Sequence, residues 1–221
     1  MSIHHHPDPA TLMSYASGTL DEAFALVVSC HLSMCGSCKK QMLDLSAIGG
    51  NLLEAGDNET VDDSVFDELM GKIRDEEPVR SNVAHLPRRK SRAGEVPIPL
   101  QRYIGTTYDK VKWKRVGPGT ATYLLPLSDG AEGSVRLLRI APKCSVPEHG
   151  HGDQELTLIL DGAYTDELGH FGAGDVADLD EHIEHQPKVT SEMDCICLAA
   201  TSAPTRFKSF IPRMLQPLIG I

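Results

Sequence analysis

The sequence predicts a multidomain protein, a small bundle of helices followed by a β-sandwich or barrel of the jelly-roll type. Up to about residue 77, apolar residues recur at helical spacing, whereas beyond Pro99 they form short stretches of strand character between Gly, Pro and Asp. The region between them is rich in Arg, Pro, Ser and Gly, which is typical of a linker. We therefore expect a helical domain at residues 1–77, a basic linker at residues 78–99 and a β domain at residues 100–221.

The charge of the chain limits the classes of partner. The 221 residues carry a net charge of −10, and residues 1–77 contain 14 acidic and four basic side chains. Direct binding to nucleic acid needs a basic face, so this composition favours a basic protein partner instead. The first residues form no apolar run after a charged start, and no apolar stretch is long enough to cross a bilayer. We expect a cytoplasmic protein whose six cysteines stay reduced.

Four helices are expected in the first part, each with a start or stop signal. They are expected to begin at Asp8-Pro9, at Thr19 in a Thr-x-x-Glu capping box, at Lys39 and at Asp62-Asp63. Gly18 and Gly49-Gly50 are expected to end the first and the third helix. A group of possible metal ligands lies at the end of the second helix.

This group is the array His31-x3-Cys35-x2-Cys38. Residues i and i+4 lie one turn apart on a helix, so His31 and Cys35 share a face and Cys38 begins the next turn. Such N and S ligands suit a tetrahedral zinc ion, which would stabilise a helical unit with little core of its own. A fourth ligand is expected from the three histidines at positions 4–6. The alternatives are a buried, reduced cysteine pair beside an unrelated histidine, or a redox motif, although no βαβ pattern surrounds it.

Five strands are expected in the second part, and a second group of possible ligands lies among them. The strands are expected at Val111–Val116, Thr120–Leu125, Val135–Ile140, Leu156–Leu160 and Cys195–Ala199. His149 and His151, two residues apart on a strand, would face the same way; Glu155 on the next strand and His185 farther along would join them. Three imidazoles and a carboxylate suit a divalent ion, the alternative being surface histidines without metal. The other histidines here are expected in loops or at the surface: His170 and His182.

These spacings resemble the two motifs of the cupin family. The first motif corresponds to His149-x-His151-x3-Glu155-x6-Gly162, and the second runs from Gly174 to His185. Two differences argue against an enzymatic cupin while leaving the ligands intact. Lys143 stands where a glycine usually begins the first motif, and Asp180 and His182 replace the proline and glycine of the second.

The whole chain resembles the ChrR family of zinc-dependent anti-sigma factors, which act in the singlet-oxygen response of certain proteobacteria. The segments that carry the resemblance are His4-His5-His6, Leu20-x-Glu22-Ala-Phe24, Gly172-Ala-Gly-Asp175, Asp194-Cys-Ile-Cys-Leu-Ala-Ala200 and Gln216-Pro217. The resemblance implies an N-terminal domain that holds an extracytoplasmic-function sigma factor away from core RNA polymerase. It also implies a cupin-like domain that is needed for the response to singlet oxygen or organic peroxide.

The resemblance further implies two zinc sites. The first would use His6, His31, Cys35 and Cys38. The second would use His149, His151, Glu155 and His185, where the identity of the metal is less certain. The chain would form a heterodimer with the sigma factor, with no direct contact to nucleic acid or membrane and no catalytic residues; self-association is left open.

The sequence is therefore consistent with two alternative functions. The first is a transcription regulator, not an enzyme, in which the helical part holds the sigma factor and the cupin-like part senses the oxidant. The second is a metal-dependent cupin enzyme, a dioxygenase or isomerase, whose helical part only dimerises it. A redox-active Fe²⁺ with open coordination positions would favour the enzyme, and a filled zinc site the sensor. Cys195 and Cys197, on one face of one strand, are expected to be small core residues, so the metal site is the expected sensor.

Overall fold

The computed structural model describes residues 2–57, 60–75, 94–203 and 206–207, and the side chains of these residues up to 203. Contacts between residues divide the chain into two compact units, which are described separately. One unit comprises residues 1–46 and 90–221, and the other comprises residues 47–89. Most of the expected linker at residues 78–99 lies outside the described residues, so the boundaries at 77 and 99 stay predictions.

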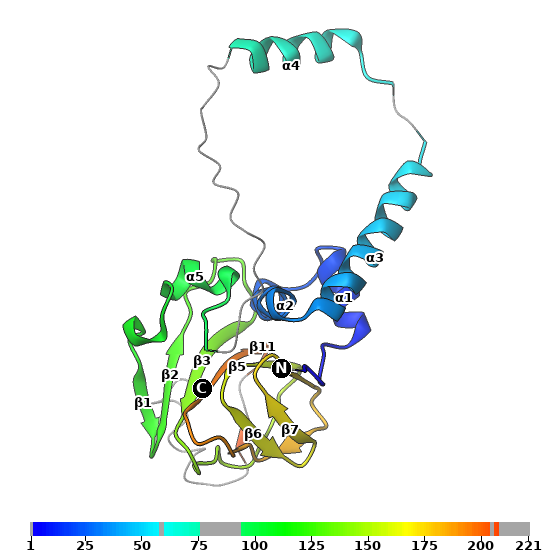
Figure 1. Ribbon diagram of the computed structural model, residues 1–221. Coiled ribbons are helices and arrows are strands. Elements are labelled where there is room, and N and C mark those ends of the chain that lie inside the picture. The colour runs from blue at the N-terminus through cyan, green and yellow to red at the C-terminus, as the bar shows by residue number, and fades with distance from the viewer. Residues whose placement is uncertain (1, 58–59, 76–93, 204–205, 208–221) are drawn as a thin grey trace. The chain divides into compact units, whose positions relative to one another are not determined.

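The described part of the chain contains five α-helices and one short 3₁₀ helix (Figure 1). They are α1 (Pro9–Ala16), α2 (Glu22–Met34), α3 (Gly36–Glu54), α4 (Asp63–Asp75), α5 (Ile98–Ile104) and η1 (Tyr108–Lys110). The four expected helices are confirmed, but three of the expected ends are wrong. α3 begins at Gly36 rather than at Lys39. The N-cap of α2 is Asp21 rather than Thr19, because the Asp21 carboxylate accepts the Ala23 N–H. α3 continues through Gly49-Gly50, since a helix tolerates glycine at a cost of about 1 kcal/mol each.

Twelve strands form three antiparallel sheets in the described residues. The six-stranded sheet has the order β1 (Lys114–Gly117), β2 (Thr120–Leu124), β3 (Ser134–Ile140), β11 (Cys195–Thr201), β5 (Glu155–Asp161), β8 (Val176–Leu179). The first three-stranded sheet contains β10 (Lys188–Val189), β6 (Ala163–Asp166) and β7 (Gly169–Gly172). The second contains β12 (Arg206–Phe207), β4 (His149–Gly150) and β9 (Glu184–His185). The five expected strands are confirmed, and the missed ones are mostly two to four residues long, too short to show an alternating pattern.

Two central strands of the six-stranded sheet, β5 and β11, are buried on both faces, which explains their continuous apolar sequences. On β5, Leu156, Leu158 and Leu160 belong to the cluster that contains α2, while Ile159 belongs to the cluster of the sandwich interior. On β11, Leu198 belongs to the cluster that contains α2, and Cys195 and Cys197 belong to the cluster of the sandwich interior. One face therefore packs against helices, and the other packs against the small sheets, because successive side chains of a strand point to opposite faces.

Helix α2 supplies most of the helical layer on the six-stranded sheet (Figure 1). Its buried side chains include Phe24, Val27 and Val28, which share one cluster with β3, β5, β11 and Leu100 of α5. Val27 and Val28 are fully buried, and the burial of each side chain stabilises the fold by about 2 kcal/mol. The apolar face of α2 is thus covered by the β domain rather than by other helices alone.

The unit at residues 47–89 contains the C-terminal part of α3 and all of α4. Asp62 accepts the Ser64 N–H at 2.8 Å just before α4, and Lys72 pairs with Glu68 one turn away. No residue of α4 is buried. Among the helices of the described ranges, none combines the length and the apolar character needed to cross a membrane.

Asp21 joins the start of α2 to a loop of the β domain. Its carboxylate accepts N–H groups of Ala23 at 2.9 Å, Glu132 at 2.9 Å and Gly133 at 3.3 Å. The loop approaches α2 so closely that a Cβ atom on Gly133 would lie 2.9 Å from the Ala23 side chain. Partial burial raises the pKa of Asp21, but the N–H donors of Glu132, Ala23 and Gly133 prevail and lower it.

We predict that Asp21→Ala lowers the free energy of unfolding of the whole chain by about 2 kcal/mol, because a helix cap and two loop hydrogen bonds are lost. Since the pKa of Asp21 is lower in the folded state, this stabilisation is complete at neutral pH and disappears as the pH falls below about 4. Urea denaturation at pH 7 measures the difference. The exposed Asp129 in the same loop provides the control, and an Asp21→Ala variant as stable as Asp129→Ala would contradict the prediction.

Candidate metal centres

The first cluster of possible ligands forms where α2 ends and α3 begins. His31 lies in the last turn of α2, and its carbonyl accepts the Cys35 N–H at 2.8 Å. Cys35 then adopts an extended backbone, which ends α2, and Cys38 lies in the first turn of α3. His6 approaches from the segment before α1. The ligand atoms of these four residues all lie within 4.8 Å of one another.

The distances in this cluster match a tetrahedral metal centre. His6 Nδ1 lies 3.5 Å from Cys35 Sγ and 3.3 Å from Cys38 Sγ. A cation with metal–sulfur bonds of about 2.3 Å and metal–nitrogen bonds of about 2.0 Å at tetrahedral angles holds such atoms about 3.5 Å apart. His31, Cys35 and Cys38 are buried, whereas His6 is exposed and closes the cluster on its solvent side. His4 and His5, the other candidates for the fourth position, are not part of this group.

The protonation of His31 suits a metal ligand. Its Nδ1 lies 2.9 Å from the carbonyl oxygen of Gly174, which can only accept, so Nδ1 carries the hydrogen. Its Nε2 is buried and has no hydrogen-bond partner among the described residues. Burial lowers the pKa of His31 to about 4, so the ring is neutral and the Nε2 lone pair faces the cluster. A buried acceptor without a partner is costly unless a cation binds it.

The two thiols of the cluster also suit binding to a cation. Burial, together with the neighbouring Cys35, raises the pKa of Cys38 to about 12. Burial also raises the pKa of Cys35, but hydrogen bonds from Cys38 and Ser37 prevail and lower it. The two thiols therefore differ in acidity, and Cys35 is the more acidic of the two. A metal ion would bind both as thiolates.

The second cluster lies at one end of the β-sandwich. His149 of β4 and His185 of β9 are directly opposite each other across an antiparallel pair. Glu155 begins β5, and His151 directly follows β4. All four side chains are buried, and their ligand atoms lie within 4.8 Å of one another.

Hydrogen bonds behind the rings orient the histidines of the second cluster. His149 Nδ1 lies 2.9 Å from the Pro147 carbonyl, and His185 Nδ1 lies 2.8 Å from a carboxylate oxygen of Asp166. Both Nδ1 atoms therefore donate, which leaves lone pairs on the two Nε2 atoms, only 3.2 Å apart. Two facing lone pairs repel unless a cation lies between them, and nitrogen atoms on one tetrahedral cation are about 3.3 Å apart. The geometry of this cluster also fits a metal ion.

Glu155 completes the second cluster as an ionised carboxylate. One of its oxygens accepts the Thr157 hydroxyl at 2.9 Å, and the other lies 3.1 Å from His151 Nδ1. Burial raises the pKa of Glu155, but the neighbouring His151, together with the other two rings, lowers it to about 2. The cluster therefore offers one negative charge and three imidazoles to a divalent ion.

The structure separates other candidate residues from these clusters. His170 and His182 are exposed, as expected. Cys195 Sγ and Cys197 Sγ lie 3.5 Å apart in the buried interior of the sandwich, and they belong to neither cluster. Sequence reasoning did not find the supporting groups, namely the Gly174 and Pro147 carbonyls, Asp166 and Thr157, because these groups have no characteristic spacing from the ligands. It also missed Tyr164, whose buried hydroxyl has no partner among the described residues.

The fold and its two clusters define a class: a cupin-like β-sandwich with a helical layer and two sites that can hold metal ions. A family model described as "ChrR Cupin-like domain" matches residues 101–204. Over 225 residues, and 100% of both chains, the sequence is 42% identical to the anti-sigma-E factor ChrR of Cereibacter sphaeroides. The chain belongs to the ChrR family.

A solved structure agrees with this assignment. The fold is similar to a chain of the crystal structure of Rhodobacter sphaeroides SigE in complex with the anti-sigma ChrR, with a TM-score of 0.77 and 38% sequence identity. The match covers 90% of this chain and 100% of that chain. The similarity therefore includes the N-terminal helices as well as the β-sandwich.

We predict that the full-length protein binds about two metal ions per chain. Replacing a ligand of one cluster should remove the ion of that cluster and leave the other ion in place. Cys38→Ser should reduce the metal content to about one ion, because one thiolate of the first cluster is lost, and His185→Ala should do the same through the second cluster. Elemental analysis of the purified variants measures the content. Cys30→Ala is the control, since Cys30 lies in the apolar core outside both clusters. Full metal content in Cys38→Ser would contradict the assignment of the first cluster.

Proposed function

We propose that this protein is a zinc-dependent anti-sigma factor that binds an extracytoplasmic-function sigma factor and keeps it from core RNA polymerase. The observation that carries the proposal is the match along 100% of the chain to an anti-sigma factor, together with the similarity to a chain solved in complex with SigE. Both relatives are named for this activity. Because the likeness includes the helices that precede the β-sandwich, the part of the chain expected to bind the partner is shared.

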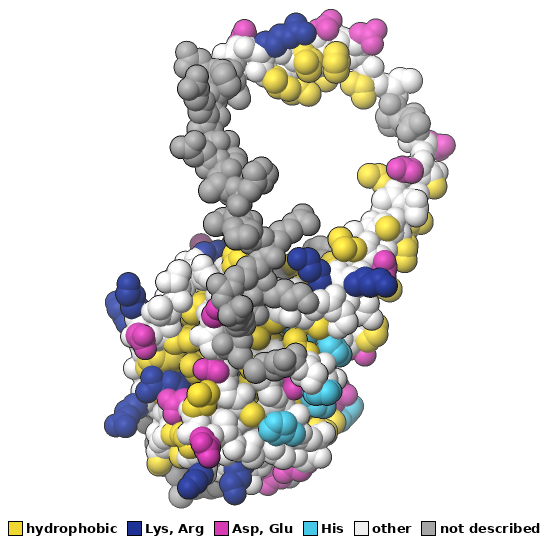
Figure 2. All heavy atoms as spheres, in the orientation of Figure 1, with side chains coloured by type: hydrophobic (Ala, Val, Ile, Leu, Met, Phe, Trp, Pro, Cys, Tyr) yellow, Lys and Arg dark blue, Asp and Glu magenta, His cyan; other side chains and the backbone are white. Residues whose placement is uncertain are grey.

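Apolar faces on α3 and α4 support a protein partner. Figure 2 shows hydrophobic side chains along both helices. On α4 the large exposed apolar residues are Val65, Phe66, Leu69 and Ile73, each more than half exposed. Leu43, Ile48, Leu52 and Leu53 are similarly exposed on α3. Large exposed apolar faces on helices are characteristic of surfaces that bind another protein, because they leave apolar area in water until a partner covers it.

The charge of these helices supports a basic partner. Residues 1–77 carry 14 acidic and four basic side chains. Acidic groups at the edge of an apolar surface accelerate association with a basic protein and discriminate against other partners. A sigma factor presents basic surfaces to DNA, so an acidic protein that competes for it has complementary charge.

Zinc is the metal that the first cluster favours. Two thiolates and two imidazoles in tetrahedral geometry are the ligands of structural zinc sites. The second cluster, with three imidazoles and one carboxylate, suits zinc or another divalent ion. In this proposal the first zinc holds the helices in the form that binds the sigma factor.

We assign the second cluster to sensing of singlet oxygen or organic peroxide. Its imidazoles are buried at one end of the sandwich, so an oxidant that reaches them would damage or displace a ligand. Loss of a ligand would leave buried lone pairs and a buried carboxylate without a cation, which destabilises the local structure. The alternative is a metal-dependent cupin enzyme whose helices dimerise it, which would also cover the apolar faces of α3 and α4. The match along 100% of the chain to an anti-sigma factor favours the regulator.

We predict that the full-length protein copurifies with one extracytoplasmic-function sigma factor when it is expressed with candidates from its own genome. Leu69→Asp should weaken this complex at least about tenfold, because it places a charge in the centre of the apolar face of α4. Isothermal titration or a pull-down at graded concentrations measures the change. Asp67→Ala is the control, because residue 67 lies on the opposite side of the helix. If no candidate sigma factor binds, the proposed function is wrong; if Leu69→Asp binds normally, α4 is not the contact.

We predict that replacing ligands of the second cluster blocks the response to oxidant without preventing inhibition. A His151→Ala, Glu155→Ala double variant should still bind the sigma factor and keep the metal of the first cluster. Transcription from a sigma-dependent promoter, measured with and without a singlet-oxygen source, should stay low in both conditions. Normal induction in the double variant would exclude the second cluster as the sensor.

A further inference from the structure

One buried carboxylate of the β domain contacts the segment that carries His6. Asp175, in the turn between β7 and β8, is only 4% exposed. Its Oδ1 accepts the backbone N–H groups of His4 at 2.7 Å and His5 at 3.0 Å. Its Oδ2 accepts the N–H of Gly172 in its own turn at 2.9 Å. One carboxylate oxygen therefore binds the N-terminal segment, and the other holds the turn.

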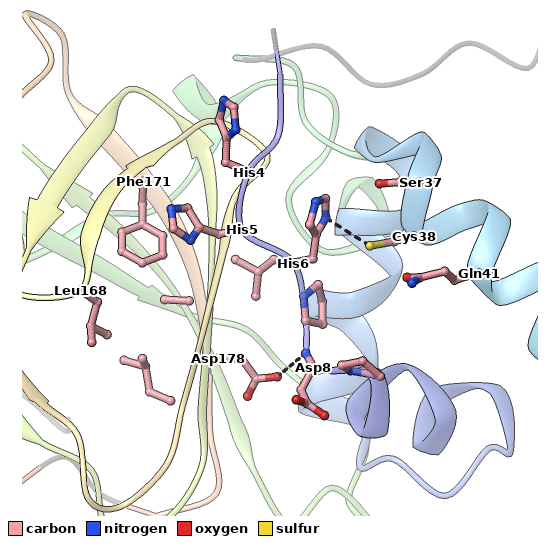
Figure 3. Close-up of a pocket in the computed structure, with 15 residues that line it drawn as sticks. His4, His5, His6, Asp8, Ser37, Cys38, Gln41, Leu168, Phe171 and Asp178 are labelled. Atoms are coloured by element: carbon pink, nitrogen blue, oxygen red, sulfur yellow. Dashed lines mark hydrogen bonds between the residues drawn. The ribbon is translucent and has the colours of Figure 1, made fainter.

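The contact with the N-terminal segment places His6 next to the thiols. The His5 carbonyl accepts the Val176 N–H at 3.1 Å, so the backbone at His4 and His5 is bound to the turn at three points. The His5 ring packs on Phe171, with ring centroids 4.3 Å apart. The next residue is His6, which Figure 3 shows pointing away from the sandwich towards Cys38. Asp175 therefore fixes the backbone position from which His6 reaches the cluster.

The contact within the turn places the acceptor for His31. The carbonyl that binds His31 Nδ1 belongs to Gly174, the residue before Asp175. Gly174 has a φ of +95°, a conformation that glycine adopts readily, and its N–H donates to the Ile159 carbonyl of β5 at 2.8 Å. The Asp175 N–H closes the turn on the Gly172 carbonyl at 2.9 Å. The carboxylate and the backbone of Asp175 together hold the turn that orients the His31 ring.

We propose that Asp175 is a positioning residue for the first metal centre, so that the β domain completes a site whose ligands all lie in the N-terminal segment and helices. Asp175 is not a ligand; it acts through His6 and His31, which reach the cluster from different segments of the chain. This inference rests on the metal site proposed above. Binding of metal at the first cluster and docking of the N-terminal segment on the β domain are then linked, because each stabilises the other by the same amount.

A second aspartate, three residues farther along the chain in β8, provides a matched comparison. Asp178 of β8 accepts the Asp8 N–H at 2.9 Å and the Thr11 hydroxyl at 3.0 Å with one oxygen, and the Gln154 amide at 3.1 Å with the other. It fastens the start of α1 to the same strand (Figure 3), but it does not hold the turn that binds His31. Replacing Asp178 therefore removes similar hydrogen bonds while leaving both ligand-orienting contacts of Asp175.

The test uses the full-length protein loaded with Co²⁺. A thiolate-to-cobalt charge-transfer band reports the first cluster alone, because the second cluster contains no sulfur, and titration with a chelator gives the metal affinity of each site. Asp175→Asn keeps the shape of the side chain but turns an acceptor into a donor facing an N–H group. We expect it to weaken cobalt binding at the first cluster by about 10- to 100-fold, the usual effect of losing a group that orients a metal ligand. Asp178→Asn should change the affinity by less than about threefold, and the second cluster should keep its affinity in both variants.

Unchanged affinity of the first cluster in Asp175→Asn would overturn the inference, as would an equal loss in Asp178→Asn. If Asp175→Asn does not fold, two variants at position 5 test the same contact. His5→Pro removes the N–H donated to Asp175 and His5→Ala keeps it, so only the proline variant should weaken the first cluster beyond the loss of the ring. Equal affinities in these two variants would also overturn the inference. If the wild-type protein shows no thiolate-to-cobalt band, the proposed metal site itself is wrong.

Discussion

The hydrogen bond from His31 Nδ1 to the Gly174 carbonyl joins helix α2 to the β domain beside the first cluster. It fixes the tautomer of a buried ligand, and it does so across the packing of α2 on the six-stranded sheet. Val27 and Val28, about one turn before His31, are buried against the same sheet and hold the helix in place. The position of the first cluster therefore depends on the β domain, although all of its ligands come from the N-terminal segment and helices.

The six-stranded sheet separates the two clusters and also connects them. Its helical face carries α2, and the row of Glu155, Thr157 and Ile159 side chains points to the other face, where the second cluster lies. β5 pairs with β8 from Glu155↔Leu179 to Leu158↔Val176, and β8 begins directly after Asp175. A change at Glu155 can thus reach the turn that supports the first cluster through one strand pair. This short path connects the proposed sensor to the first cluster, and through it to the helices that are proposed to bind the sigma factor.

The sequence grouped the candidate ligands that the structure brings together, but it did not reveal their surroundings. His31, Cys35 and Cys38 are close along the chain, and His149, His151 and Glu155 have the spacing of a strand and its neighbour, so local geometry was sufficient to group them. His6 could not be distinguished from His4 and His5 by spacing, because the choice depends on where Asp175 holds the backbone. The packing of α2 on the sheet could not be predicted either, because the sequence of an apolar helix face does not indicate which surface covers it. α5 and the short strands carry too few residues for a periodic pattern.

In this interpretation, the first metal centre and the docking of the N-terminal segment on the β domain form one cooperative structure. Hydrogen exchange measured by mass spectrometry on the metal-loaded full-length protein and on Cys38→Ser tests it most directly. If the structure is cooperative, loss of the first metal reduces protection at residues 4–11, at the end of α2 and at residues 172–176 of the β domain, while β3 and β11 stay protected. Loss of protection confined to residues 31–40 would contradict it, because the metal centre would then be independent of the β domain.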